Sequence, residues 1–246
     1  MKKIFRKLTV LLTALLCMAS TWAQTTAQLT VADGTSTNEY VPVYGIYCDY
    51  YIRTQIIYPA SMLVEMTNGT LNAMTFYLSS TATAAWTSTF EVRLWETSTS
   101  SFTDATWYTE DEDDWKVVYT GTLDGTEETM TITFNDPYDY GGGNLLVDLR
   151  STDKANYSQA YFYGVTASNA ALSGYNSSSV ESITSPTTRG FLPKTLFDYD
   201  AAPVSCNTPG TPVAAGVTAS SATFNWDAAE GASEYQYVIM PQGEDG

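Results

Sequence analysis

The sequence predicts an all-β protein: a jelly-roll-like β-sandwich followed by an incomplete second sandwich. Three observations lead to this fold class. Short alternating runs of β-branched and aromatic residues recur along the chain, and Gly, Asn, Asp and Pro stand between them. No window of about 11 residues keeps the apolar stripe of a helix. Many short strands joined by turns are typical of sandwiches and jelly rolls.

Residues 1–23 have the order of a secretory signal peptide. An apolar run from Leu8 to about Ala19 is followed by small residues, and Ala23 precedes Gln24. The run is preceded by four basic residues, Lys2, Lys3, Arg6 and Lys7. It is shorter than the roughly 18 apolar residues that span a bilayer, and no later stretch approaches that length. We therefore expect cleavage after Ala23, no membrane span in the mature chain, and a secreted or cell-surface location.

The expected mature chain is strongly acidic. The full sequence has 11 basic and 27 acidic residues, and removal of the four basic residues of the signal peptide leaves a net charge of about −20. A surface of this charge repels phosphate backbones and anionic lipids. Nucleic acid is therefore disfavoured as a partner, whereas a glycan or an extracellular protein remains compatible.

The chain has no histidine. Nucleophile systems that use an imidazole base, and zinc sites that use histidine ligands, are therefore excluded. No GxSxG motif occurs, and the run Gly141-Gly142-Gly143 lacks the residues of a phosphate-binding loop. The sequence thus predicts a protein that is not an enzyme and needs no cofactor.

Residues 24–200 are long enough for one β-sandwich domain. The runs that read most clearly as strands are 71–78, 89–96, 115–123, 129–134, 144–150 and 159–165. In the second run Phe90, Val92 and Leu94 point to one side of the strand. The charged residues of that run mostly point to the other side and predict one wet face: Glu91, Arg93 and Glu96.

Residues 201–210 begin a stretch rich in proline and glycine that predicts a linker. After cleavage of the signal peptide the chain keeps two cysteines, Cys48 and Cys206. In an oxidising compartment they could form a disulfide, and two free thiols are an equal alternative because the sequence gives no distance between them.

Residues 211–246 resemble the start of a fibronectin type III domain. The run "SATFNW" resembles its strand B and places Ala222, Phe224 and Trp226 on one face, and "EYQYVI" resembles strand C. The resemblance implies that Trp226 is the core tryptophan and that Tyr235 or Tyr237 is the strand-C tyrosine. Such a sandwich needs about seven strands in roughly 100 residues, so we expect an incomplete domain and a chain that is the front part of a longer protein.

The larger domain resembles an all-β, adhesin-like module at the front of secreted multidomain surface proteins of Gram-negative bacteria. The matching segments are "YVPVY" (40–44), "RTQIIYPA" (53–60), "GTLNAMTFY" (69–77), "VYTGTL" (118–123) and "DPYDYGGGNLLV" (136–147). The resemblance implies a surface-exposed adhesion or accessory role and brings no catalytic residues with it.

Two groups of residues are candidate sites. The acidic run "TEDEDDW" contains Asp111, Asp113 and Asp114, which either bind a structural calcium ion or form a solvated acidic turn. The turn is favoured, because the run lacks the EF-hand spacing and charge runs are usually solvent faces. Trp86, Trp107 and Tyr108 lie in connecting stretches rich in Thr, Ser and Ala, and they are the aromatic residues expected to be exposed for ligand contact.

These features favour an exported, non-catalytic module for binding or adhesion, with a glycan or protein ligand. The alternative is the accessory N-terminal region of a secreted hydrolase whose catalytic domain lies beyond residue 246. A structural spacer and a hydrolase within residues 24–199 are weaker hypotheses, the latter because no catalytic motif occurs.

Overall fold

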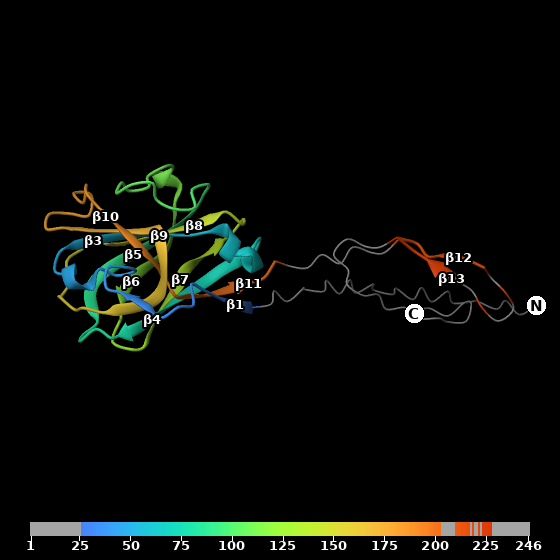
Figure 1. Ribbon diagram of the computed structural model, residues 1–246, viewed down its shortest axis with the longest axis horizontal. Helices are drawn as coiled ribbons and strands as arrows, with labels where there is room; N and C mark the ends of the chain where they lie inside the picture. Colours follow the sequence, from blue (N-terminus) through green and yellow to red (C-terminus); the bar gives the residue numbers. More distant parts are fainter. Residues whose placement is uncertain (1–25, 203–209, 217, 219–220, 222, 228–246) are drawn as a thin grey trace, which may run out of the picture.

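β-Sheet dominates the structure, which is a computed structural model that describes residues 26–202, 210–216, 218, 221 and 223–227 (Figure 1). Within these residues the helices are single 3-10 turns: η1 Gly45–Tyr47, η2 Ala60–Met62, η3 Val64–Met66 and η4 Glu112–Asp114. The predicted all-β fold class is therefore confirmed. None of the described helices has the length and apolar character needed to cross a membrane. The expected signal peptide lies outside the described residues.

The body consists of two antiparallel sheets. Sheet A has the order β1 (Thr26–Val31), β11 (Thr195–Asp200), β4 (Thr70–Ser80) and β7 (Thr129–Asp139). Sheet B has the order β6 (Lys116–Leu123), β5 (Trp86–Thr97), β8 (Asn144–Ser151), β3 (Tyr51–Tyr58) and β9 (Tyr161–Asn176). The strands β2 (Ser36–Asn38) and β10 (Thr187–Pro193) pair with β9. The end of β4 also pairs with β9 and joins the two sheets.

The strand pairs are nested. β5 pairs with β6, β4 with β7 and β3 with β8, so that each pair encloses the previous one along the chain. The same nesting continues outward in the pairing of β1 with β11. The chain is thus a long antiparallel hairpin whose arms are distributed over both sheets.

The hydrophobic core lies between the sheets. Phe90, Val92 and Leu94 of β5 are fully buried there, as the alternation of that strand predicts. All six runs predicted as strands overlap β4 to β9. The expectation of a wet outer face is wrong for Arg93, which is only 6 % exposed. The reason is that residues 98–115, between β5 and β6, lie over the outer face of sheet B.

The region resembling a fibronectin type III domain forms a short antiparallel pair, β12 (Val213–Ala215) and β13 (Thr223–Asn225). Phe224, predicted to face a buried interior, is 51 % exposed. The described part of this region supplies one two-stranded sheet, which cannot cover its own apolar side chains. Trp226 is half-buried, and Tyr235 and Tyr237 lie outside the described residues.

Candidate functional site

The covering loop, residues 98–115, packs on the outer face of sheet B. A second hydrophobic cluster holds it there, separate from the main core: Ile57, Phe102, Trp115, Leu146 and Leu172, with Trp95, Trp107 and Tyr108 at its border. In Figure 1 this loop stands at the top of the view, in green. The two sides of sheet B are therefore both covered in this region, which creates an enclosed environment for the charged residues of its outer face.

Strand register brings these charged residues together. Because side chains alternate along a strand, Arg53 and Gln55 of β3 share the outer face with Asp148 and Arg150 of β8. The register places Arg53 opposite Arg150 and Gln55 opposite Asp148. On the other side of β8, Arg93 lies opposite Asp148. The carboxylate of β8 thus stands between two arginines from neighbouring strands.

We name Arg53, Arg93, Glu112 and Asp148 the buried ion-pair network. Asp148 is fully buried, and its Oδ1 accepts a hydrogen bond from Arg53 Nε at 2.6 Å while its Oδ2 accepts one from Arg93 Nη2 at 2.7 Å. Glu112 Oε1 accepts from the Nη2 of both arginines, at 2.8 Å for Arg53 and 2.7 Å for Arg93. Two guanidinium groups are therefore bridged by one carboxylate from the sheet and one from the covering loop.

The network sets the protonation state of its central acid. Burial alone would raise the pKa of Asp148, but the charges of Arg53 and Arg93 and their hydrogen bonds outweigh this effect and hold the pKa below its usual value. Asp148 is therefore ionised in the folded protein. A buried carboxylate with this many donors is a structural anchor for the outer face.

Further polar contacts fasten the covering loop. Gln55 donates from Nε2 to the Tyr108 carbonyl at 2.9 Å and accepts from the Tyr108 N–H at 2.9 Å. The indole Nε1 of Trp107 donates to the Ile183 carbonyl at 2.6 Å. The Arg53 guanidinium lies 5.0 Å from the centre of the Trp107 ring, and that of Arg93 lies 4.9 Å from the Trp115 ring. The loop is thus held by hydrogen bonds and by stacking on the arginines.

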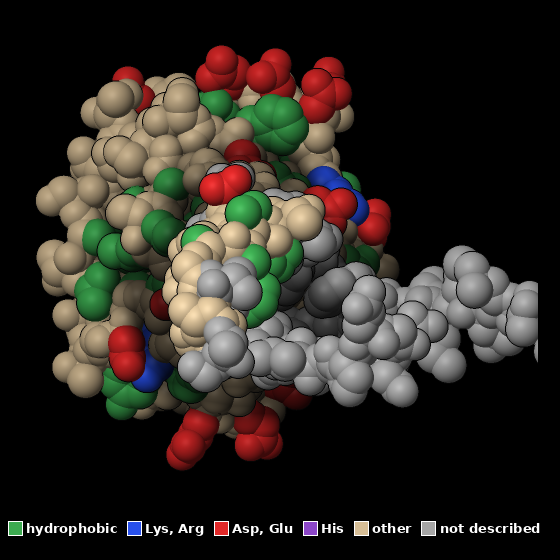
Figure 2. Space-filling view, turned by 90° about the vertical axis from the view of Figure 1, so that its right-hand side faces the viewer, with side chains coloured by type: hydrophobic (Ala, Val, Ile, Leu, Met, Phe, Trp, Pro, Cys, Tyr) green, Lys and Arg blue, Asp and Glu red, His purple; other side chains and the backbone are tan. Residues whose placement is uncertain are grey.

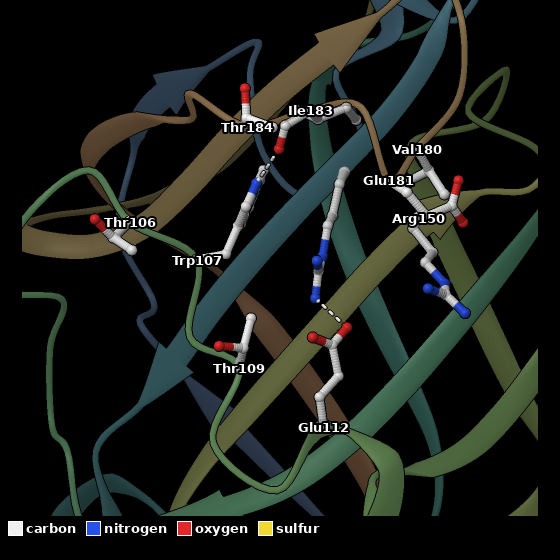
Figure 3. A pocket seen from close by; sticks show the side chains of 10 residues that line it. Thr106, Trp107, Thr109, Glu112, Arg150, Val180, Glu181, Ile183 and Thr184 are labelled. Atoms are coloured by element: carbon white, nitrogen blue, oxygen red, sulfur yellow. Dashed lines mark hydrogen bonds and ion pairs between the residues drawn. The ribbon is translucent and has the colours of Figure 1, made fainter.

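A pocket of about 430 Å³ opens beside the buried ion-pair network. Trp107 forms one side of it, and Val180, Glu181 and Arg150 face it from the other side (Figure 3). The remaining lining residues are Arg53, Thr106, Thr109, Glu112, Ile183 and Thr184. We call it the Trp107 pocket. Its floor comes from rigid strands and its walls from two connecting segments, the arrangement in which binding residues often occur.

Gly174 of β9 allows the two walls to meet. A Cβ atom at this position would lie 2.5 Å from Cγ2 of Ile183 and 3.2 Å from Cζ2 of Trp107. Real Cβ atoms do not approach other atoms at the shorter of these distances, so only glycine leaves room for both side chains. The side chains of Trp107 and Ile183 therefore both lie close to the backbone of β9 at this position.

The three aromatic residues predicted to be exposed lie in two different environments. Trp107 and Tyr108 are half-buried at the covering loop, and Trp107 lines the pocket. The expectation is wrong for Trp86, which is 1 % exposed and donates from Nε1 to the Ser158 carbonyl at 2.7 Å. Trp86 opens β5 and packs into the main core, although its sequence neighbours are small and polar.

The acidic run forms the 3-10 turn η4, which Asp111 enters with φ of 51°. Asp111, Asp113 and Asp114 are exposed, whereas Glu112 between them turns inward to the arginines. Among the residues that the structure describes, no three Asp, Glu or Cys side chains converge on one point as metal ligands. Calcium binding by this run therefore stays a prediction without a described ligand set.

Cys48 is fully buried, and its Sγ lies 3.8 Å from the Tyr44 carbonyl. Burial raises the pKa of its thiol. Cys206, the second cysteine of the expected mature chain, lies outside the described residues. The structure therefore does not test whether the two cysteines pair or stay free thiols.

Sequence reasoning missed the charged residues that line the floor of the pocket or lie beneath it. Arg53 and Asp148 are 95 positions apart, and each reads as an ordinary outward charge on its own strand. The available signal was their position within runs whose other residues are mostly apolar or β-branched, "YIRTQIIY" and "NLLVDLRS", where a charge is unusual and calls for a partner.

Acidic side chains are far more frequent than basic ones on the face drawn in Figure 2. The net charge of the whole sequence is −16. No protein-family model, curated protein or solved structure matches this chain. The fold and the pocket therefore carry the functional argument.

Proposed function

We propose that the chain is an exported, non-catalytic binding module whose ligand is a glycan held in the Trp107 pocket. The observation that carries this proposal is the pocket itself, in which an indole, two arginines, two carboxylates and three threonines line one cavity of about 430 Å³. An apolar ring with a few fixed polar groups is typical of small-ligand sites. Glycans need both, because a sugar has apolar C–H faces and hydroxyl edges.

The non-catalytic role is supported by the state of the charged groups. Asp148, Glu112 and Glu91 are each held by an arginine at 2.6 to 2.8 Å, which leaves them as positioning groups. The chain has no histidine that could act as a general base. A binding role does not require a general base.

Two finer assignments of fold belong to the same proposal. The nested pairing of β3–β8, β4–β7 and β5–β6 over two sheets supports a jelly-roll topology, since that fold is a long hairpin rolled into a sandwich. The alternation of "SATFNW" supports a fibronectin type III region around β13.

The basic, apolar and small residues of positions 1–23 support export and a secreted or cell-surface location.

The test is binding of the purified chain to an array of immobilised glycans and extracellular matrix proteins. We expect binding to a subset of glycans, at least tenfold weaker for Trp107→Ala. The matched control is Tyr157→Ala, which removes an aromatic ring that is 62 % exposed and lies outside the pocket. Equal binding by both variants, or binding to no glycan, would overturn the proposal.

A further inference from the structure

We infer that the Trp107 pocket selects an uncharged sugar and discriminates against sugars that carry a carboxylate. This inference rests on the proposed function and adds to it the class of ligand. Three observations support it: the charge balance of the lining, the donors and acceptors that the lining still offers, and the apolar wall.

The first observation is the balance of charge in the lining. Arg53 and Arg93 share Asp148 and Glu112, and Arg150 donates from Nε and Nη2 to Glu91 Oε1 at 2.9 and 2.6 Å. Three arginines are thus matched by three carboxylates. Glu181 adds a fourth acid. Of these side chains Arg53, Arg150, Glu112 and Glu181 line the pocket, so the lining itself holds two cations and two anions and has no net charge. A ligand carboxylate would therefore find no unmatched cation in the lining.

Glu181 is ionised near neutral pH. Hydrogen bonds from its own backbone and from Ser179 lower its pKa, and the nearby charges of Arg150 and Arg53 lower it further. It is exposed at the pocket wall, where it can accept a hydrogen bond from a ligand hydroxyl. Its negative charge repels an acidic ligand at the same position.

The lining offers both hydrogen-bond donors and hydrogen-bond acceptors to a ligand. Within the described part of the chain, Nη1 of Arg53 and Nη1 of Arg150 have no hydrogen-bond partner, and the same holds for Oε2 of Glu112. A hydroxyl group accepts from a guanidinium and donates to a carboxylate at the same time. Neighbouring hydroxyls on a sugar ring satisfy both kinds of group, which a simple anion or cation cannot do.

The apolar wall of the pocket provides a surface on which the ring of a sugar can pack. Trp107 is fixed by its hydrogen bond to the Ile183 carbonyl, and Val180 and Ile183 provide further apolar surface. The C–H face of a pyranose packs on such a surface while its hydroxyls face the charged groups. A cavity of about 430 Å³ lies within the range of small-ligand sites.

The test compares sugars that differ only at C6, where the neutral sugar has a hydroxymethyl group and its uronate a carboxylate. Saturation-transfer NMR on the purified chain would use the methyl glycosides of glucose and galactose beside those of glucuronic and galacturonic acid. We expect transfer to at least one neutral sugar, at least tenfold weaker signals from its uronate, and loss of the signal in Trp107→Ala. Binding of the neutral sugar should change less than twofold between 0.05 and 0.5 M NaCl, because no ligand charge is screened.

The variant Glu181→Gln provides a second measurement that does not depend on Trp107. The amide oxygen still accepts a hydrogen bond, so binding of the neutral sugar should change less than threefold. Preferential binding of the uronates, strengthened in Glu181→Gln and weakened by salt, would overturn the inference and leave the binding function standing. Transfer to none of the four sugars, together with an array that shows no glycan binding, would overturn both.

Discussion

At the scale of single residues, Asp148 determines how the outer face of sheet B is organised. It is fully buried, and it accepts hydrogen bonds from Arg53, Arg93 and Gln55. Each donor reaches it from a neighbouring strand. Removal of its charge leaves two buried guanidinium groups with Glu112 as their remaining shared partner.

We predict that Asp148→Asn lowers the free energy of unfolding at pH 7 by about 3 kcal/mol, since breaking a buried ion pair leaves uncompensated charge. Denaturant unfolding measures the difference. The control is Asp136→Asn, which removes an exposed pair with Lys116 and should cost less than about 1 kcal/mol. Equal effects of the two substitutions would contradict the role given to Asp148.

The same residue sets a pH dependence whose sign follows from its lowered pKa. A carboxyl group with a folded pKa below its unfolded value, about 3.9, contributes stability that is complete above that value and is lost as the pH falls through the folded pKa. The stability difference between the wild type and Asp148→Asn should therefore be constant from about pH 5 to pH 7 and shrink below about pH 4. A difference that grows on acidification would contradict this assignment.

At the scale of elements, the close approach of β9 and β10 depends on Gly164. A Cβ atom there would lie 2.2 Å from the Leu192 carbonyl oxygen and 2.7 Å from Cζ of Phe191. The carbonyl belongs to the paired strand and cannot move without disturbing the ladder. This position therefore requires glycine for space.

We predict that Gly164→Ala destabilises the protein by about 1–3 kcal/mol, the usual range for overpacking. Gly190, at the irregularity in the same strand pair, is the matched control, because a Cβ there has its nearest contact at 3.8 Å. Gly190→Ala should be neutral or slightly stabilising, since alanine reduces the freedom of the unfolded chain. Thermal unfolding compares the two, and a smaller loss for Gly164→Ala than for Gly190→Ala would refute the prediction.

The elements show what sequence patterns can predict. The alternation of residues 89–96 identified β5 and its buried residues Phe90, Val92 and Leu94. It could not show that Arg93 is buried, because the cover is the following segment 98–115, which folds back over the strand, and not the strand itself. Trp86 was misplaced for a similar reason: its neighbours are small and polar, but the strand directs its ring into the core.

The candidate site was predicted only in part. Trp107 was identified by its type and its polar surroundings, and it lines the pocket. Arg53, Arg150 and Glu181 were not identified, because their proximity arises from the pairing of β3 with β8 and from the segment after β9. Contacts between residues far apart in the chain depend on strand order, which a single sequence does not reveal.

At the scale of the whole molecule, two properties are combined. The chain is acidic overall, with a net charge of −16, yet its pocket is built from balanced pairs of arginine and carboxylate. We expect the overall charge to repel anionic polymers. The pocket is suited to an uncharged ligand, so the surface and the site favour the same class of partner.

The most direct measurement is a crystal structure of the chain soaked with the neutral sugar that gives the strongest NMR signal. We predict a sugar ring in the Trp107 pocket, packed on Trp107 and hydrogen-bonded to Arg150 or Glu181. A sugar bound elsewhere would contradict the assignment of the site. One such place is the stacked pair Tyr47 and Tyr175, whose ring centres lie 3.5 Å apart. An empty Trp107 pocket at a sugar concentration that saturates binding in solution would contradict it as well.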